Sequence, residues 1–380
     1  MNYFDHNATS PMHPAARQAW LDAVEKFIGN PSSPHRVGSR ADAALTEARQ
    51  KLAGFLGCDA LDMVWTSGAT ESNNMAFHHF ARSLETKKEV WISAIEHPCV
   101  LEATKHYFPH RHRLIPVTPA GVADLDWLRK QISKRSPGAV AVMAANNETG
   151  VLQPWREVLA LCREREVPLF CDATQWIGKL PANRLGDCDF VSGSAHKFGG
   201  PKGVGFLKCP AKGRVEPLLR GGMQEEGRRA GTENVAAVLA MVAALEARET
   251  ALREAMMENG KWRMESLRAA FEKRMQAVLA GSKIVGSDAP RLWNTVSALM
   301  PEADCQQRWV VKLDKLGFAV STGSACASGK EEPSHVMAAM GYSSAEAGRV
   351  LRFSSGWETK EEEWSELVEA LVKVHRGMRG

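Results

Sequence analysis

Lys197 is the residue whose surroundings most directly suggest covalent chemistry. It lies in the segment Phe190 to Gly205, where an apolar run leads through small residues to this lysine and then to a glycine-rich turn. A lysine in a close-packed site loses hydration, so its pKa falls and its neutral amine becomes a nucleophile toward carbonyl groups. An aldehyde cofactor requires such an amine. The alternative is an ordinary surface lysine in a turn between a strand and a helix.

A carboxylate stands at a comparable position in the segment Pro168 to Gln175, an apolar run that ends in Asp172 just before a helix start. Pyridoxal phosphate, an aldehyde cofactor, withdraws electrons only while its ring nitrogen is protonated, and a neighbouring carboxylate keeps it so. Asp172 suits this role, and Gln175 suits a hydrogen bond to the ring hydroxyl oxygen. The alternative role for Asp172 is a helix cap.

The turn that follows Trp65 is rich in small and hydroxyl residues and opens a helix. Exposed backbone N–H groups and the positive end of a helix make such a turn an anion site, to which Thr70 can add a hydroxyl. This suits a cofactor phosphate. The turn lacks both the Gly-Lys-Ser/Thr ending of a P-loop and the G-x-G-x-x-G pattern of dinucleotide-binding proteins.

His97 comes just after another apolar run, Glu89 to Ser93. An imidazole at that position can stack on a flat pyridine ring and can accept or donate a proton during a reaction. The alternative is an ordinary polar loop residue. Elsewhere, three histidines have no Asp, Glu or Cys at ligand spacing, so they indicate a solvated stretch and no metal site is expected; these are His106, His110 and His112.

Cys326 differs from the other cysteines in its setting. It lies in Ser321 to Ser334, a stretch too small and polar for a strand or a buried helix, which predicts an exposed and mobile thiol. Cys162 and Cys171 lie in apolar runs, where a packing role is preferred. An exposed thiol can move between a cofactor and a partner and can attack a substrate sulfur.

The composition limits the classes of function. The 380 residues carry a net charge of +4 with no basic tail or stripe, so nucleic acid is not an expected partner. The longest uncharged apolar run, Val235 to Leu245, is 11 residues long and too short to cross a membrane. The amino-terminal residues do not form an export signal, and the eight cysteines contain no C-x-x-C pair. We expect a cytoplasmic protein with reduced thiols.

The elements that must position these residues form two domains. From about residue 60 to 210, short apolar runs alternate with helical stretches, which predicts a mostly parallel sheet covered on both faces. In such sheets ligands bind at the carboxyl edge, where the candidate residues lie. The predicted strands are Asp62 to Thr66, Glu89 to Ser93, Ala139 to Ala144, Leu169 to Asp172, Phe190 to Ser192 and Val204 to Lys208.

A long helical stretch from Thr232 to Leu279 is expected to connect to a second domain. The remainder combines short strand-like runs, such as Val350 to Phe353, with an amphipathic helix from about Lys360 to His375, which predicts a small α+β domain. The amino-terminal strand can pack on either domain.

Nine segments, in order along almost the whole chain, resemble the cysteine desulfurases of the NifS/IscS type, which belong to the class V aminotransferases. They are Phe4–Thr9, Asn30–His35, Thr66–Asn74, Asn146–Gly150, Ser194–Lys197, Gly221–Glu225, Arg229–Asn234, Gly323–Ser328 and Glu332–Val336. The resemblance implies an α/β fold-type I pyridoxal-phosphate enzyme with a large domain built on a seven-stranded sheet. It also implies a homodimer that converts L-cysteine to L-alanine and leaves the sulfur on an enzyme cysteine as a persulfide.

The domain limits that we expect are 12–257 for the large domain, with 1–11 and 258–380 forming the small one. By resemblance, Lys197 carries the cofactor, Asp172 pairs with the ring nitrogen, Gln175 bonds the ring oxygen and His97 stacks on the ring. The remaining roles follow in the same way: phosphate binding by Thr70, Ser194 and His196, phosphate binding across the dimer by Thr232, and substrate binding by Asn147 and Arg352.

Cys326 corresponds to the sulfur acceptor of the family. The loop from Cys326 to Pro333, with seven residues after the cysteine, resembles the subgroup with a longer loop, whose cysteine passes sulfur to an acceptor or scaffold protein. The charged residues Lys330 to Glu332 depart from the small or apolar residues of that subgroup, so the sequence leaves the recipient open.

Three alternatives remain at this point. One is a selenocysteine lyase or a desulfurase dedicated to a single pathway, which would use the same cofactor. Another is a scaffold protein that keeps the fold without the chemistry. The last is an ordinary aminotransferase, which would produce a keto acid.

Overall fold

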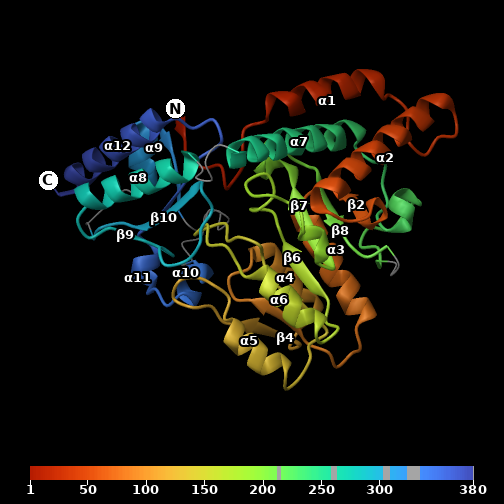
Figure 1. Cartoon of the computed structure of the whole chain (residues 1–380), viewed down its shortest axis with the longest axis horizontal. Helices are drawn as coiled ribbons and strands as arrows, with labels where there is room; N and C mark the ends of the chain where they lie inside the picture. Colours follow the sequence, from red (N-terminus) through yellow and green to blue (C-terminus); the bar gives the residue numbers. More distant parts are fainter. Residues whose placement is uncertain (212–214, 258–262, 303–308, 323–333, 380) are drawn as a thin grey trace.

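The computed structural model describes residues 1–211, 215–257, 263–302, 309–322 and 334–379. Figure 1 shows the largest sheet in one half of the molecule, together with helices α1 to α7, while the carboxyl-terminal helices surround smaller sheets in the other half. No helix within these ranges is long and apolar enough to span a membrane.

Within the described ranges, seven strands form the large sheet in the order β2-β8-β7-β6-β5-β3-β4. The strands from β7 to β4 in this order run parallel, whereas β8 is antiparallel to both neighbours, β7 and β2. This confirms the predicted mostly parallel sheet. The strands are β2 (Met63–Thr66), β3 (Val90–Ser93), β4 (His112–Ile115), β5 (Ala139–Ala141), β6 (Leu169–Asp172), β7 (Phe190–Ser194) and β8 (Gly205–Lys208).

Both faces of this sheet are buried. In β2, Met63 and Trp65 join the hydrophobic core under α2, α6 and α7, while Val64 joins the core under α3 and α4. In β6, Cys171 joins the first of these cores and Phe170 joins the second, because successive side chains of a strand point to opposite faces. The helices are α1 (Pro14–Lys26), α2 (Arg36–Leu56), α3 (Ala69–Ser83), α4 (Pro98–Tyr107), α5 (Leu125–Ile132), α6 (Trp155–Arg163) and α7 (Val235–Met257).

The smaller half contains an antiparallel sheet in the order β12-β13-β10-β9 and a short parallel pair of β1 and β11. Helices α8, α9 and α12 bury a separate core against these strands. The strands are β1 (Asn2–Tyr3), β9 (Lys283–Ile284), β10 (Thr295–Leu299), β11 (Phe318–Ala319), β12 (Ser321–Thr322) and β13 (Val350–Ser354). The helices are α8 (Arg263–Val278), α9 (Trp309–Lys315), α10 (His335–Ala339), α11 (Ser344–Ala347) and α12 (Glu361–Arg379).

The amino-terminal segment joins the two halves. The Phe4 N–H donates to the Ala319 carbonyl at 2.8 Å, and the Ser10 N–H donates to the His196 carbonyl at 2.7 Å. The question of where the first strand packs is therefore answered: β1 belongs to the smaller half, and the residues after it cross to the turn that carries Lys197.

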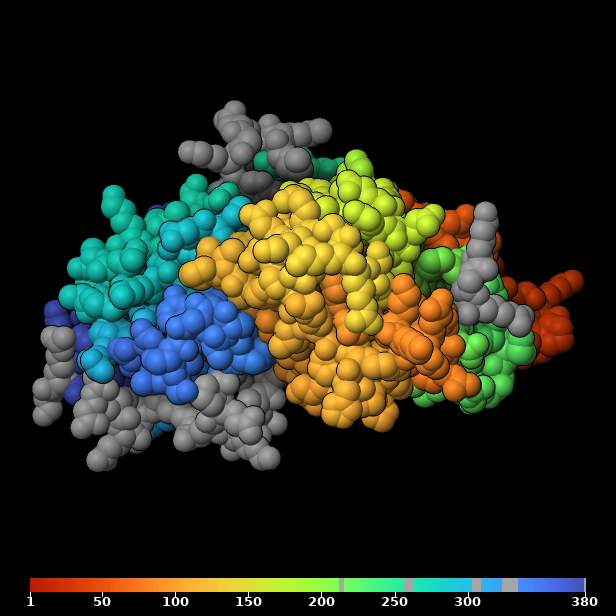
Figure 2. Space-filling model, turned by 90° about the horizontal axis from the view of Figure 1, so that it is seen from below, coloured from red at the N-terminus to blue at the C-terminus, as the bar shows by residue number. Residues whose placement is uncertain are grey.

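A small apolar cluster also bridges the halves. Val336, Met337 and Met340 pack with Ile95, which lies beyond β3 of the large sheet. In Figure 2, α10 and α11 (blue) lie against the orange and yellow surface of the larger half.

The six strands predicted for the large sheet are all present. The strand Leu169–Asp172 has the predicted bounds, and the others differ at one end; for example, the strand expected at Ala139–Ala144 ends at Ala141. The helical stretch expected from Thr232 to Leu279 contains α7 and α8, and the residues between them lie outside the described ranges. Strand β4 was not predicted: His112, which was assigned to a solvated stretch, begins this strand at the edge of the sheet and is half-buried, while His106 and His110 are exposed.

Candidate active site

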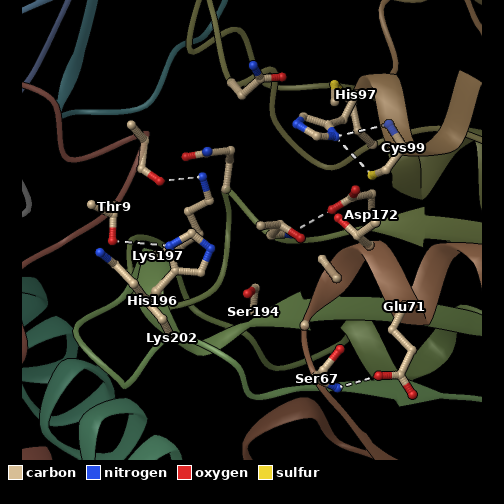
Figure 3. Close-up of a pocket in the computed structure, with 18 of the residues that line it drawn as sticks. Thr9, Ser67, Glu71, His97, Cys99, Asp172, Ser194, His196, Lys197 and Lys202 are labelled. Atoms are coloured by element: carbon tan, nitrogen blue, oxygen red, sulfur yellow. Dashed lines mark hydrogen bonds between the residues drawn. The ribbon is translucent and has the colours of Figure 1, made fainter. Parts of the chain in front are cut away.

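A cavity of about 570 Å³ lies at the carboxyl ends of the parallel strands, and Figure 3 shows side chains from several of the loops that follow them converging on it. Among the residues expected to form a site, eight line this cavity: Thr70, His97, Asn147, Asp172, Gln175, Ser194, His196 and Lys197. Thr232 and Arg352 do not line it. Cys326 lies outside the described residues.

Lys197 ends the short helical turn that follows β7. Its Nζ donates to the main-chain carbonyl oxygens of Asn7 at 2.7 Å and Ala8 at 2.8 Å, so the amino-terminal segment fixes the direction of the amine. Both acceptors are neutral. Lys197 lines the cavity, with its amine held by these two main-chain carbonyls.

Asp172 is the last residue of β6 and is buried. The Asn73 side-chain amide of α3 donates to one carboxylate oxygen at 2.9 Å, and the Thr174 N–H donates to the other at 3.0 Å. These neutral donors orient the carboxylate without neutralising it. It is therefore suited to pair with a protonated ring nitrogen.

His97 caps the amino terminus of α4, because its Nδ1 accepts from the Cys99 N–H at 3.2 Å. An accepting Nδ1 carries no proton, so in the neutral ring the proton is on Nε2. Burial lowers the pKa of His97, with Asp172 opposing the shift and Lys197 adding to it. The ring is therefore neutral near pH 7 and suited to cover a flat aromatic cofactor.

Cys99 also lines the cavity, and the sequence did not single it out. Its Sγ lies 2.9 Å from His97 Nδ1 and accepts from the Asn73 side-chain amide at 3.0 Å. Burial, with a further contribution from Asp172, raises the pKa of the Cys99 thiol to about 12. Its thiolate is therefore scarce at neutral pH, which makes it a poor nucleophile.

The anion site is built at the start of α3. Gly68 caps this helix without a side-chain hydrogen bond, and the residues of the turn from 67 to 71 line the cavity. The first N–H groups of a helix have no partner within the helix, so this end suits an anion. Ser194 and His196 line the same cavity from the opposite segment. Burial, together with Lys197, lowers the pKa of His196 to about 4, so it acts as a neutral hydrogen-bonding group.

An ion pair supports this turn. Arg229 donates to one Glu71 oxygen at 2.8 Å, and the Ser67 N–H donates to the other at 2.7 Å. Burial acts to raise the pKa of Glu71, but these hydrogen bonds outweigh it and lower that pKa overall. The Glu71 charge is therefore compensated by Arg229 before any phosphate binds.

Asn7 is a functional residue that the sequence interpretation missed. Its carbonyl accepts from Lys197 Nζ at 2.7 Å and from Gln175 Nε2 at 2.9 Å. Its side-chain Oδ1 accepts from Lys179 Nζ at 2.8 Å, and its Nδ2 donates to Thr295 Oγ1 at 2.9 Å. One asparagine thus links Lys197 to both halves of the molecule.

Arg352 lies behind Asn147. Its Nη1 donates to the Asn147 carbonyl at 2.9 Å, and its Nη2 pairs with Asp5 Oδ1 at 2.8 Å. Its buried Nε has no hydrogen-bond partner in the described part of the chain. The guanidinium is therefore next to the cavity but already engaged with Asp5, which the sequence did not predict.

The groups in the cavity fit pyridoxal phosphate. Asp172 would pair with the ring nitrogen, the start of α3 would hold the phosphate, and Lys197 would bind the aldehyde. Thr174 also lines the cavity, and its buried Oγ1 has no hydrogen-bond partner among the described residues. The volume lies within the usual range of roughly 300 to 1,000 Å³ for small-molecule sites.

Glu148 gives a prediction about pH. Burial raises the pKa of this carboxyl from 4.5 to about 7, although a hydrogen bond from Ser334 and the charge of Arg352 oppose the shift. Because the folded-state pKa is the higher one, the folded protein loses stability as the pH rises through this interval. Glu148→Gln removes the titration, so urea unfolding should show the variant gaining about 2 kcal/mol relative to wild type between about pH 5 and pH 8. A difference that stays constant over this interval would contradict the raised pKa.

Comparison with known proteins identifies the family. The family model described as aminotransferase class-V matches residues 2–367. The chain belongs to the class V aminotransferase family, whose members use pyridoxal phosphate. Within it, the chain is similar to a curated cysteine desulfurase from Klebsiella pneumoniae, with 38% identity over 98% of this chain and 92% of the relative.

Solved structures give the same result. A NifS-like protein superimposes with a TM-score of 0.87 at 32% identity, covering 99% of both chains. A structure described as SspA in complex with cysteine superimposes with a TM-score of 0.79 at 28% identity, covering 93% of this chain and 98% of the other. These matches confirm the fold that the sequence predicted.

Proposed function

We propose that this protein is a pyridoxal-phosphate-dependent cysteine desulfurase that releases L-alanine from L-cysteine and transfers the sulfur to its own Cys326. The observation that carries the proposal is the convergence of Lys197, Asp172 and His97 with the start of α3 on one cavity. Family membership and the similarity to cysteine desulfurases support it.

Each residue of the cavity is assigned a separate role in cofactor binding or catalysis. When bound, pyridoxal phosphate supplies an electron sink for the bonds around the substrate Cα. Lys197 would hold the cofactor covalently and is placed to move a proton at the substrate. Asp172 would keep the ring nitrogen protonated, Gln175 would bind the ring oxygen and His97 would cover the ring. Phosphate binding falls to Thr70, Ser194 and His196.

Substrate binding is assigned to Asn147 and Arg352. The buried N–H group at Arg352 Nε has no acceptor among the described residues. A planar guanidinium recognises carboxylates well. A substrate carboxylate would exchange with Asp5 on Nη2. Asp5 then serves as the resting partner that keeps this buried cation paired before substrate arrives.

The sulfur step balances without a further reactant. The Cys326 thiolate attacks the substrate sulfur, an S–S bond forms, and the C–S bond breaks with its electron pair moving to carbon, which takes a proton. One cysteine and one enzyme thiol thus give one alanine and one enzyme persulfide. The persulfide then passes to an acceptor or scaffold protein.

The protein is further proposed to be a cytoplasmic homodimer in which Thr232 binds the phosphate of the partner subunit. The exposure of Thr232, and its absence from the cavity of its own chain, support this. The proposed domains are 12–257 for the large one, and 1–11 with 258–380 for the small one. Separate hydrophobic cores in the two halves support the division.

A single-turnover experiment tests the function. Purified protein supplied with pyridoxal phosphate should turn yellow, and L-cysteine should then yield about one alanine and one protein persulfide per active site in the absence of reductant. Alanine is quantified by mass spectrometry and the persulfide by alkylation and intact mass. A protein that stays colourless, or one that accumulates a keto acid, would overturn the proposal.

A further inference from the structure

Lys179 is a buried lysine in the turn after β6, with only 4% of its surface exposed. Its Nζ donates to Asn7 Oδ1 at 2.8 Å and to Gln175 Oε1. Both acceptors are neutral, and no ion pair of Lys179 occurs among the described residues. Burying an amine without a carboxylate partner costs folding free energy. We therefore looked for a functional role of Lys179 in its two hydrogen bonds.

The first consequence concerns the amide of Gln175, which lines the cavity. Its Oε1 accepts from Lys179, and its Nε2 donates to the Asn7 carbonyl at 2.9 Å. An amide has one oxygen acceptor and two N–H donors. Because the oxygen is held by Lys179, the amide cannot rotate to exchange its two ends, and the second N–H of Nε2 is the group left for the cavity.

The second consequence concerns Lys197. Asn7 Oδ1 accepts from Lys179 and, at 3.1 Å, from the Asn294 side-chain amide, so the Asn7 side chain is held from two sides. The carbonyl of the same residue accepts from Lys197 Nζ at 2.7 Å. Lys179 therefore contacts, through Asn7, the group that directs the cofactor lysine.

We propose that Lys179 is a positioning residue of the cofactor site: it fixes the Gln175 amide so that an N–H faces the cofactor ring oxygen, and it holds the Asn7 group that directs Lys197. This inference rests on the proposed function, since it assigns a residue to the same pyridoxal-phosphate site.

The chain offers a matched control. Lys208 in β8 is also buried. Its Nζ donates to the Cys188 carbonyl at 2.8 Å and lies 3.9 Å from Asp62 Oδ2, and neither partner lines the cavity, whereas Gln175, the partner of Lys179, does. Lys179→Met and Lys208→Met each remove one buried amine. Comparing the two separates a general loss of stability from an effect on the cofactor site.

The experiment measures pyridoxal-phosphate binding by the visible absorbance of the holoenzyme during dialysis and back-titration. Lys179→Met should weaken binding by about tenfold, the effect of one hydrogen bond of typical strength, and shift the visible absorption maximum. Lys208→Met should change neither. If Lys179→Met does not fold, Lys179→Gln, which keeps an N–H donor on a shorter side chain, replaces it and should show a smaller change of the same kind.

A double-mutant cycle tests the route of action. If Lys179 acts through Gln175, its replacement should have most of its effect in wild type and little in a Gln175→Leu background. Equal behaviour of the Lys179 and Lys208 variants, or full additivity with Gln175→Leu, would overturn the inference. A wild-type protein that does not bind pyridoxal phosphate would instead overturn the proposed function, so the two failures are distinguishable.

Discussion

Replacing Lys197 with alanine is expected to abolish covalent cofactor binding and to lower alanine release from L-cysteine by at least about 10³-fold, the scale of removing a group that handles protons in the reaction. This variant loses the amine that the Asn7 and Ala8 carbonyls direct into the cavity. The measurement is borohydride reduction followed by denaturation. Wild-type protein should keep the cofactor on the peptide that contains Lys197, and the variant should release it.

Lys202 provides the control for this variant, because it also lines the cavity but is exposed. Lys202→Ala should keep the reducible cofactor bond and most of the activity. If Lys197→Ala retained a reducible bond, or if the cofactor were trapped on Lys202 in wild type, the assignment of the cofactor lysine would be wrong.

The sequence could predict the large sheet and the residues at its carboxyl edge because both depend on local patterns. Buried parallel strands are short apolar runs, and the polar residue that ends each run must lie at the edge where the strands end. Asp172 and His97 were found in this way, and both line the cavity. Strand β4 was missed because it lies at the edge of the sheet, with Arg113 and Leu114 exposed, and lacks the apolar pattern.

The supporting network could not be predicted from local patterns. Asn7 lies 190 positions from Lys197, and only the folded chain brings its carbonyl to the amine. The motif Phe4–Thr9 contributed to the family resemblance, but no residue type in it specifies that contact. Likewise, nothing near Arg352 in the sequence shows that Asp5 engages its guanidinium, because the pair is separated by 347 positions.

The structure also narrows the choice of sulfur acceptor. Burial raises the pKa of each of three cysteines to about 12, namely Cys99, Cys162 and Cys209. Burial likewise raises the pKa of Cys58 to about 11. Cys99 is the cysteine of the described chain that lines the cavity, yet at pH 8 only about one thiol in 10⁴ of pKa 12 is ionised. It is close enough to compete for the sulfur but lacks the thiolate to do so.

Cys326→Ala should therefore keep the yellow cofactor while losing protein persulfide, and its alanine release from L-cysteine should fall by about 10² to 10³-fold, the loss of a positioned nucleophile. Alanine release from selenocysteine should persist, because a selenium substituent leaves carbon more readily and depends less on attack by an enzyme thiol. Equal loss with both substrates would favour a selenocysteine lyase that uses Cys326 in another way.

Cys99→Ala is the matched control inside the cavity and should keep persulfide formation. Persulfide that remains in Cys326→Ala and disappears only when Cys99 is also replaced would place the acceptor on Cys99, in spite of its raised pKa.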